Sequence, residues 1–179
     1  MQHNLNKATL GGGCFWCVEA CFQKLKGVES VVSGYAAGKT ENPSYEDVKK
    51  GITGHAGVVQ VSFNQEIIPY ENILKVFFSI HDPTQLNKQG NDIGTQYRSI
   101  ILTHSEEHMK IAKEYIEKLT NEKVFNAPIV TEVSQIDKFF NAEEYHQNYF
   151  NQHPENPYCS YTVKKKVEKF LVTFANWLK

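Results

Sequence analysis

The chain has 179 residues, of which 41% are hydrophobic and 22% charged, the proportions of a single globular domain. Nineteen basic and twenty acidic residues give a formal net charge of -1, which argues against a nucleic-acid partner held by a broad basic face. No apolar run approaches the ~20 residues of a membrane span, and the polar start lacks the apolar stretch of a signal peptide. We therefore expect a cytoplasmic protein with no membrane partner.

Strands and helices alternate along the first part of the chain. A short strand at 8–10 runs through three glycines into a helix at 14–25, and a second strand covers 28–36. A long ordered loop, rich in Gly, Pro and Asn, is predicted at 37–55, and such loops are usually functional. A further strand follows at 58–63.

The rest of the chain continues this alternation, with a second irregular stretch inside it. A helix opened by Pro69 is followed by an irregular stretch at 81–95 and a strand at 98–103. A helix capped by Ser105 and a strand at 129–133 come next. The last predicted elements are a short helix with a capping box of Asn141 and Glu144, and a final helix at 163–178. This order predicts one α+β domain over 1–179, with a core at about 8–161 on which the last helix packs.

The strongest local signal is the run Gly11-Gly12-Gly13-Cys14-Phe15-Trp16-Cys17. A strand, three glycines and a helix place Cys14 at or near a helix N-terminus, where free N–H groups and the helix dipole favour a negative charge. Such a position can lower a thiol pKa from ~8.5 into the range ~3.5–7.5, and the thiolate is the nucleophile. We therefore expect Cys14 to be reactive, rather than a small buried core residue.

Two large aromatic residues, Phe15 and Trp16, follow this cysteine directly. Either they belong to the core, or they line a pocket beside the thiol. Neighbouring side chains diverge on a helix, so one straight turn cannot present both to the core. A methyl or thioether group would suit a pocket of this kind, since sulfur packs well on aromatic rings.

The other cysteines leave several possibilities open. Cys17 completes a C-x-x-C motif, which can form a disulfide in the first helical turn or supply zinc ligands. Cys21 is expected to be buried. No second C-x-x-C accompanies Cys21 and Cys159, and the order H-S-E-E-H differs from the metalloprotease motif, so no metal site is predicted. His104 and His108 are therefore expected on a solvated helix face.

At the cysteine motif the sequence resembles a known family, the A-type peptide methionine sulfoxide reductases. The resemblance covers about 8–161, nearly the whole chain, and includes both long loops. The stretches that carry it, besides Gly13-Cys14-Phe15-Trp16, are Gly34-Tyr35, Asn42-Pro43-Ser44-Tyr45, Thr53-Gly54-His55-Ala56, Asp82-Pro83-Thr84-Gln85, Gln89 to Ser99, and Ala142-Glu143-Glu144-Tyr145-His146-Gln147.

The resemblance implies a fold and an activity. The fold is a two-layer α/β sandwich with a ferredoxin-like core. The activity is reduction of the S epimer of methionine sulfoxide, free or in proteins, without a metal or organic cofactor. Thioredoxin is implied as the reductant, and we expect the enzyme to be a monomer.

The resemblance also implies roles for single residues. Cys14 is the nucleophile, Phe15 and Trp16 hold the substrate methyl group, and Asp92 helps to position substrate or water. Tyr45 and Tyr97 donate hydrogen bonds to the sulfoxide oxygen, a task that suits phenols because they donate without being charged.

A second thiol completes the implied cycle. Cys14 becomes a sulfenic acid, which condenses with another cysteine to a disulfide, and an external dithiol then reduces that disulfide by exchange. Cys159 matches the recycling cysteine of the family, and Cys17 is the alternative partner because it is near in sequence.

One position departs from the family pattern. After Gly54-His55-Ala56 the family has a glutamate that protonates the sulfoxide oxygen, whereas this chain has Gly57. The activity is therefore expected to be impaired unless another acid replaces it. Glu19, Glu46 and Asp47 are available in the sequence, but nothing in the sequence places them in the pocket.

Two other functions compete with this interpretation. The first is a thioredoxin-like disulfide oxidoreductase that uses Cys14 and Cys17. The second is a non-catalytic binder of oxidised methionine, which is motivated by Gly57.

Overall fold

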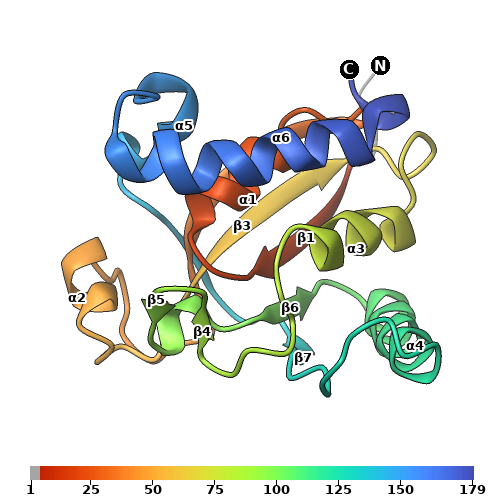
Figure 1. Ribbon diagram of the computed structural model, residues 1–179. Coiled ribbons are helices and arrows are strands. Elements are labelled where there is room, and N and C mark those ends of the chain that lie inside the picture. Colours follow the sequence, from red (N-terminus) through yellow and green to blue (C-terminus); the bar gives the residue numbers. More distant parts are fainter. Residues whose placement is uncertain (1–4) are drawn as a thin grey trace.

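A computed structural model describes residues 5–179; residues 1–4, the start of the polar N-terminal stretch, lie outside the described residues. A six-stranded sheet with the order β7-β6-β1-β3-β2-β8 forms the centre of the molecule (Figure 1). Its strands are β1 (Asn6–Gly11), β2 (Val28–Ala36), β3 (Ala56–Phe63), β6 (Ile100–Thr103), β7 (Glu132–Gln135) and β8 (Phe139–Asn141).

The helices connect these strands and cover the sheet. They are α1 (Phe15–Phe22), α2 (Tyr45–Lys49), α3 (Tyr70–Ser79), α4 (Glu106–Asn121), α5 (Tyr149–Gln152) and α6 (Lys164–Thr173). Single 3-10 turns occur at Thr95–Tyr97, Glu144–His146 and Ala175–Trp177, and a π-helical turn at Cys159–Val163 precedes α6.

The inner part of the sheet has ferredoxin-like topology. The chain order β1-α1-β2-β3-α3-β6 gives the strand order β6-β1-β3-β2, in which all neighbours are antiparallel. At one edge β7 adds to β6 in parallel, and at the other β8 adds to β2 antiparallel. The expected α+β sandwich with a ferredoxin-like core is therefore confirmed.

The two faces of the sheet bury different side chains, because side chains alternate along a strand. On one face Leu10, Val59 and Val61 are fully buried under α1 and α3, and α6 packs on α1 (Figure 1). The opposite face holds a smaller cluster of Ala36, Ala56, Val58, Ile100 and Leu102, with Ile136 and Phe139 packed against it. The main core therefore lies between the sheet and the helices.

The C-terminal end is attached to the segment that follows α1. Leu178 forms an isolated antiparallel bridge with Leu25, and the Lys26 N–H donates to the Trp177 carbonyl over 2.8 Å. Together with the buried Val167 and Phe170, these contacts place α6 on the body of the domain.

Several sequence predictions differ from the structure at short elements. The predicted loop at 37–55 contains α2, whose N-cap Ser44 accepts from the Asp47 N–H. The stretch at 81–95 contains the two-stranded hairpin β4 (Lys88–Gln89) and β5 (Asp92–Ile93). Elements of two to five residues carry too little periodicity to be recognised.

The predicted capping box is wrong, and neither histidine lies on a solvated helix face as predicted. Asn141 ends β8 instead of capping a helix, and the following 3-10 turn has no side-chain cap. His104 precedes α4 and pairs with the Thr9 hydroxyl, while His108 is buried and stacks on Tyr70 with ring centroids 3.9 Å apart. The helix therefore uses His108 as a core aromatic.

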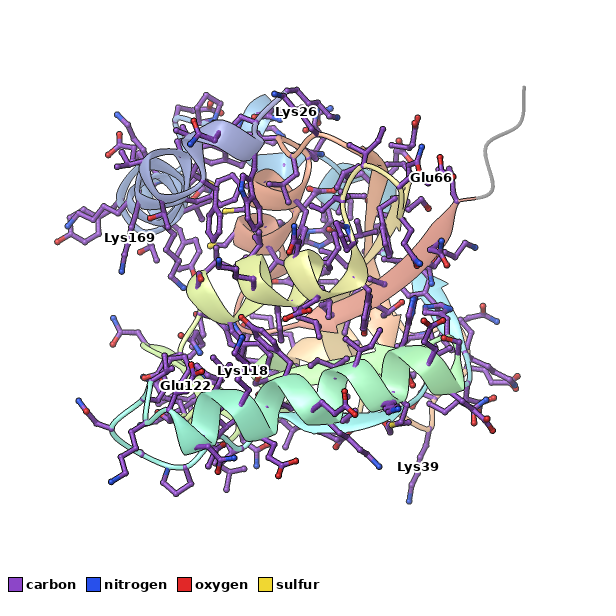
Figure 2. The ribbon with its side chains drawn as sticks, turned by 90° about the vertical axis from the view of Figure 1, so that its right-hand side faces the viewer. Lys26, Lys39, Glu66, Lys118, Glu122 and Lys169 are labelled. Atoms are coloured by element: carbon purple, nitrogen blue, oxygen red, sulfur yellow. The ribbon has the colours of Figure 1, made fainter. Side chains whose placement is uncertain are left out.

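The outer surface carries the charged side chains. Lys39, Lys118 and Glu122 lie on the outside of the ribbon (Figure 2). Within residues 5–179, no helix combines the length and the hydropathy that crossing a membrane requires.

Two valines of α6 test whether this helix packs on the domain. Val167 is 4% exposed and Val172 is 81% exposed. We expect Val167→Ala to lower the free energy of unfolding by about 2 kcal/mol, because two buried carbons are lost and a cavity remains. Val172→Ala should change it by less than about 0.5 kcal/mol. Urea denaturation of both variants measures the difference, and equal effects would show that α6 does not pack as described.

Candidate active site

The glycine run places Cys14 at the start of α1. Gly13 has a φ of 80°, which favours glycine, and its N–H donates to the Tyr97 carbonyl over 3.1 Å. A Cβ at Gly12 would lie 2.6 Å from the His81 ring, so that turn also requires a glycine. Cys14 is the N-cap of α1, as the sequence predicts, and it is partly exposed.

A cavity of about 160 Å³ opens at this cysteine. It brings together residues from α1, α2, β2, β3, the β4–β5 hairpin and the segment before α6. Its lining consists of Gly13, Cys14, Phe15, Trp16, Tyr35, Tyr45, Val48, Lys49, Gly57, Asp92, Gln96, Tyr97 and Tyr158. Most of the predicted site residues therefore meet in one pocket, although they are far apart in the sequence.

Phe15 and Trp16 both line the pocket, and other aromatic rings hold them in place. The Trp16 ring stacks on Tyr149 with centroids 3.9 Å apart and an interplanar angle of 10°. Its Nε1–H donates to His146 Nδ1 over 3.2 Å. Phe15 is 6% exposed and packs against Tyr35 with ring centroids 5.9 Å apart. Phe15 thus serves both the core and the pocket wall, which the sequence had presented as alternatives.

Two tyrosines bring hydroxyl groups to the same pocket. Burial raises the pKa of Tyr45 to about 12, and burial together with the nearby Asp92 raises the pKa of Tyr97. Both phenols therefore keep their protons near neutral pH and can donate hydrogen bonds. The Glu143 carboxylate accepts from the Tyr45 backbone N–H over 2.9 Å and fixes the start of α2.

Asp92 also lines the pocket, and Tyr158 is bonded to it. The Tyr158 hydroxyl donates to Asp92 Oδ2 over 2.6 Å. The Tyr158 ring meets Trp16 edge-on, with centroids 6.1 Å apart. The segment before α6 thus contributes one wall of the pocket.

The electrostatics of Cys14 differ from the sequence prediction. Burial raises its pKa well above the ordinary value, and Cys17 adds to this, while the Trp16 N–H lowers it only in part. An eight-residue helix offers less stabilisation to a thiolate than removal from water costs. The direction of the Cys14 pKa shift is therefore opposite to the one that its place at a helix start predicts.

The other three cysteines lie outside the pocket lining. Cys17, Cys21 and Cys159 are buried free thiols, and burial raises the pKa of each. Cys21 is thus buried as predicted, while Cys159 begins the π-helical turn directly after the pocket residue Tyr158. Across residues 5–179, no group of three or more His, Cys, Asp or Glu side chains could hold a metal ion.

Gly57 faces the pocket from β3. It pairs with Tyr35 across the strands, and both residues line the cavity. A Cβ at Gly57 would lie 3.6 Å from the Gln96 carbonyl oxygen and 3.7 Å from Phe15, which is ordinary contact. A Cβ at this position would therefore fit beside residues that line the pocket.

None of the three acids considered as replacements reaches this place. Glu19 is buried in α1 and accepts from the Asn148 N–H over 2.8 Å. Glu46 and Asp47 occupy the first turn of α2, and neither lines the pocket. Among the pocket-lining residues of the described chain, Asp92 is the only carboxylate.

Sequence reasoning assigned no role to several lining residues. Tyr35 and Gln96 fall within the stretches that carry the family resemblance, so that signal could have found them. Tyr158 is adjacent to Cys159, which is a weaker signal. No sequence signal points to Val48 and Lys49, because they lie in α2, a helix too short to be predicted.

Comparisons with known proteins agree with this geometry. The family model "Peptide methionine sulfoxide reductase" matches residues 6–177. A peptide methionine sulfoxide reductase MsrA of Polynucleobacter asymbioticus is 52% identical over 170 residues, 95% of this chain and 90% of the relative. Mxr1 from Saccharomyces cerevisiae in reduced form is 37% identical with a TM-score of 0.81, covering 87% of this chain and 89% of that one.

A second solved structure contains a partner. Mxr1 from Saccharomyces cerevisiae in complex with Trx2 matches with a TM-score of 0.59 and 26% identity, over 83% of this chain and 89% of that one. Since the family model spans nearly the whole chain and a relative shares half of its residues, the chain belongs to the peptide methionine sulfoxide reductase family.

Proposed function

We propose that this chain reduces the S epimer of methionine sulfoxide, free or in proteins, with Cys14 as the nucleophile. The observation that carries the proposal is the convergence in one cavity of a thiol, an aromatic wall and two protonated phenols. These groups match the three parts of a methyl sulfoxide: an electrophilic sulfur, an apolar methyl group and a basic oxygen.

The pocket would orient the substrate before any bond changes. The methyl group packs on Phe15 and Trp16, because sulfur-bound methyl groups contact aromatic rings favourably. The oxygen accepts hydrogen bonds from the Tyr45 and Tyr97 hydroxyls, and Asp92, fixed by Tyr158, helps to position substrate or water. The substrate sulfur then lies beside the Cys14 thiol.

The first chemical step transfers one oxygen atom. The Cys14 sulfur attacks the sulfoxide sulfur to form a sulfur–sulfur bond, and the protonated oxygen leaves the substrate sulfur as its sulfur–oxygen bond breaks. The oxygen then adds to the Cys14 sulfur, the sulfur–sulfur bond breaks, and methionine leaves Cys14 as a sulfenic acid. Methionine is thereby reduced by two electrons and Cys14 is oxidised by two. The proton on the sulfenic oxygen balances the one that the thiol loses, so the net step consumes no external acid.

A second thiol then regenerates the enzyme. It condenses with the sulfenic acid, releases water and leaves a disulfide. We infer that Cys159 is this thiol, since it adjoins the pocket through Tyr158 and lies in a π-helical turn, a form found mostly as single turns at functional sites. Cys17 is the alternative, but its N–H bonds to the Cys14 carbonyl within the first turn, which would have to distort.

The reductant and the location follow from the same chemistry. We infer that thioredoxin reduces the disulfide by thiol exchange, as the complex of the related Mxr1 with Trx2 suggests. Four free cysteines suit the reducing cytoplasm. A monomer suffices for the reaction, since one chain supplies every residue of the pocket lining.

The competing functions have less support. A family match over residues 6–177 argues against a thioredoxin-like disulfide exchanger. A non-catalytic binder would take up methionine sulfoxide without forming methionine, so one turnover by the reduced protein distinguishes binding from catalysis.

The role of Cys14 is tested by substitution. Cys14→Ser should reduce methionine formation to background, because a serine hydroxyl without a nearby base is a poor nucleophile. Single-turnover assays of the reduced protein with methionine sulfoxide measure this directly. Cys21→Ala, which removes a buried thiol outside the pocket, should retain the activity. Substantial methionine formation by Cys14→Ser would rule out this nucleophile.

The recycling partner is tested by mapping the disulfide after one turnover. We expect peptides joined through Cys14 and Cys159, and we expect Cys159→Ser to stop at the sulfenic acid after one equivalent of methionine. Cys17→Ser serves as the matched control and should still form the Cys14–Cys159 bond. A dominant Cys14–Cys17 bond in the parent protein would contradict the assignment.

Gly57 is tested by restoring a carboxylate. Gly57→Glu should raise the single-turnover rate by about 10²–10⁴-fold, the usual contribution of a positioned general acid. Gly57→Gln has the same size without the acidic proton, and we expect it to stay close to the parent rate. A fast parent that gains nothing from Gly57→Glu would show that another group delivers the proton.

A further inference from the structure

The segment behind the pocket, residues 142–149, has no part in the chemistry described so far. We call it the backing segment. The Glu143 carboxylate accepts from the Tyr35 hydroxyl and from the Tyr45 N–H, each over 2.9 Å. Asn148 donates its N–H to the buried Glu19. The segment is therefore fixed to β2, α2 and α1, the elements that carry much of the pocket lining.

His146 is the most buried polar residue of this segment. It is 2% exposed, and its ring centroid lies 4.3 Å from that of Tyr45 and 5.4 Å from that of Phe15. Its Nδ1 accepts from the Trp16 Nε1–H over 3.2 Å. Its Nε2 is buried and has no hydrogen-bond partner.

The two ring nitrogens of His146 have different hydrogen-bonding roles. An indole N–H can only donate, so Nδ1 must be the acceptor and the ring proton of the neutral imidazole sits on Nε2. That proton is buried without a partner, which is unfavourable. An apolar residue would fill the same space without this cost. The feature that a histidine adds here is therefore the acceptor for Trp16.

The hydrogen bond between Trp16 and His146 affects which substrate groups the Trp16 ring can contact. Nε1 is the only polar atom of the Trp16 side chain, and its N–H is bonded to His146, a residue that does not line the cavity. With this donor occupied, the Trp16 ring has no free hydrogen-bond donor for the substrate. Such a wall accepts a methyl group and offers no hydrogen bond to an oxygen.

We propose that His146 is a specificity-determining positioning residue, which makes the pocket selective for one sulfoxide epimer by holding the Trp16 N–H away from the methyl site. The inference rests on the proposed function. For a fixed direction of attack by Cys14, the two epimers exchange the places of oxygen and methyl. The wrong epimer would put its oxygen on the Phe15–Trp16 wall, where no donor meets it.

The test compares two substitutions at His146. His146→Phe keeps an aromatic ring but removes the acceptor, so the indole N–H becomes free to turn towards the pocket. The ratio of single-turnover rates for the S and R epimers should then fall by about tenfold, the effect of one hydrogen bond. His146→Gln restores an acceptor and should keep the ratio within about twofold of the parent. If His146→Phe does not fold, His146→Leu replaces it.

A second pair of variants separates this role from a merely structural one. Trp16→Phe has no N–H to hold away, so adding His146→Phe to Trp16→Phe should leave the epimer ratio unchanged. In a Trp177→Phe background, where Trp16 is the only tryptophan, His146→Phe should shift the emission to longer wavelength as the indole loses its anchor, and His146→Gln should not.

The outcomes distinguish failure of the role of His146 from failure of the proposed function. An unchanged epimer ratio in His146→Phe, with both rates lowered equally or not at all, overturns the role of His146 while the proposed function stands. An unshifted Trp16 emission in that variant also overturns it. If the parent protein reduces neither epimer, the proposed function itself fails, and epimer selectivity fails with it.

Discussion

One backbone hydrogen bond joins the two halves of the site. The Gly13 N–H donates to the Tyr97 carbonyl and so ties the turn before Cys14, the proposed nucleophile, to the segment that carries the Tyr97 hydroxyl. Gly12 and Gly13 make the approach possible, since a side chain at Gly12 would clash with His81. The positions of Cys14 and Tyr97 relative to each other, and hence the fit of a sulfoxide between them, depend on this contact.

Burial shifts the pKa values of the proposed nucleophile and of both proposed hydrogen-bond donors in the same direction. It raises the pKa of the Cys14 thiol and of the Tyr45 and Tyr97 phenols, which favours the protonated form of each group. This differs from a site that stores a thiolate beside a cation. A buried thiol is a weak nucleophile until substrate arrives, but it keeps the proton that the departing oxygen requires. In the proposed mechanism, Gly57 supplies no side chain to carry this proton, whereas Cys14 remains its source.

The sequence was most informative where a pattern extended over several residues. The strand at 28–36 was predicted with its observed bounds, and the helix after Pro69 followed from its apolar stripe. The motif around Cys14 and the resemblance together identified most of the pocket lining. The direction of the Cys14 pKa was predicted wrongly, because the helix start is visible in the sequence whereas the depth of burial is not. Tyr158 bonds to Asp92, which is far away in the sequence, and no local pattern encodes that contact.

The attachment of the C-terminal end limits how far Cys159, the proposed recycling cysteine, can move. Leu178 pairs with Leu25, Lys26 bonds to Trp177, and Val167 is buried in the core, so α6 cannot swing as a rigid rod. Any displacement of Cys159 must be absorbed between Tyr158 and Val163. The extra residue held in each π-helical hydrogen-bonded ring provides chain length there, which rewinding to an α-helix would release. In the proposed cycle, this turn would supply the chain length that a Cys14–Cys159 disulfide needs, so the core beneath it need not unfold.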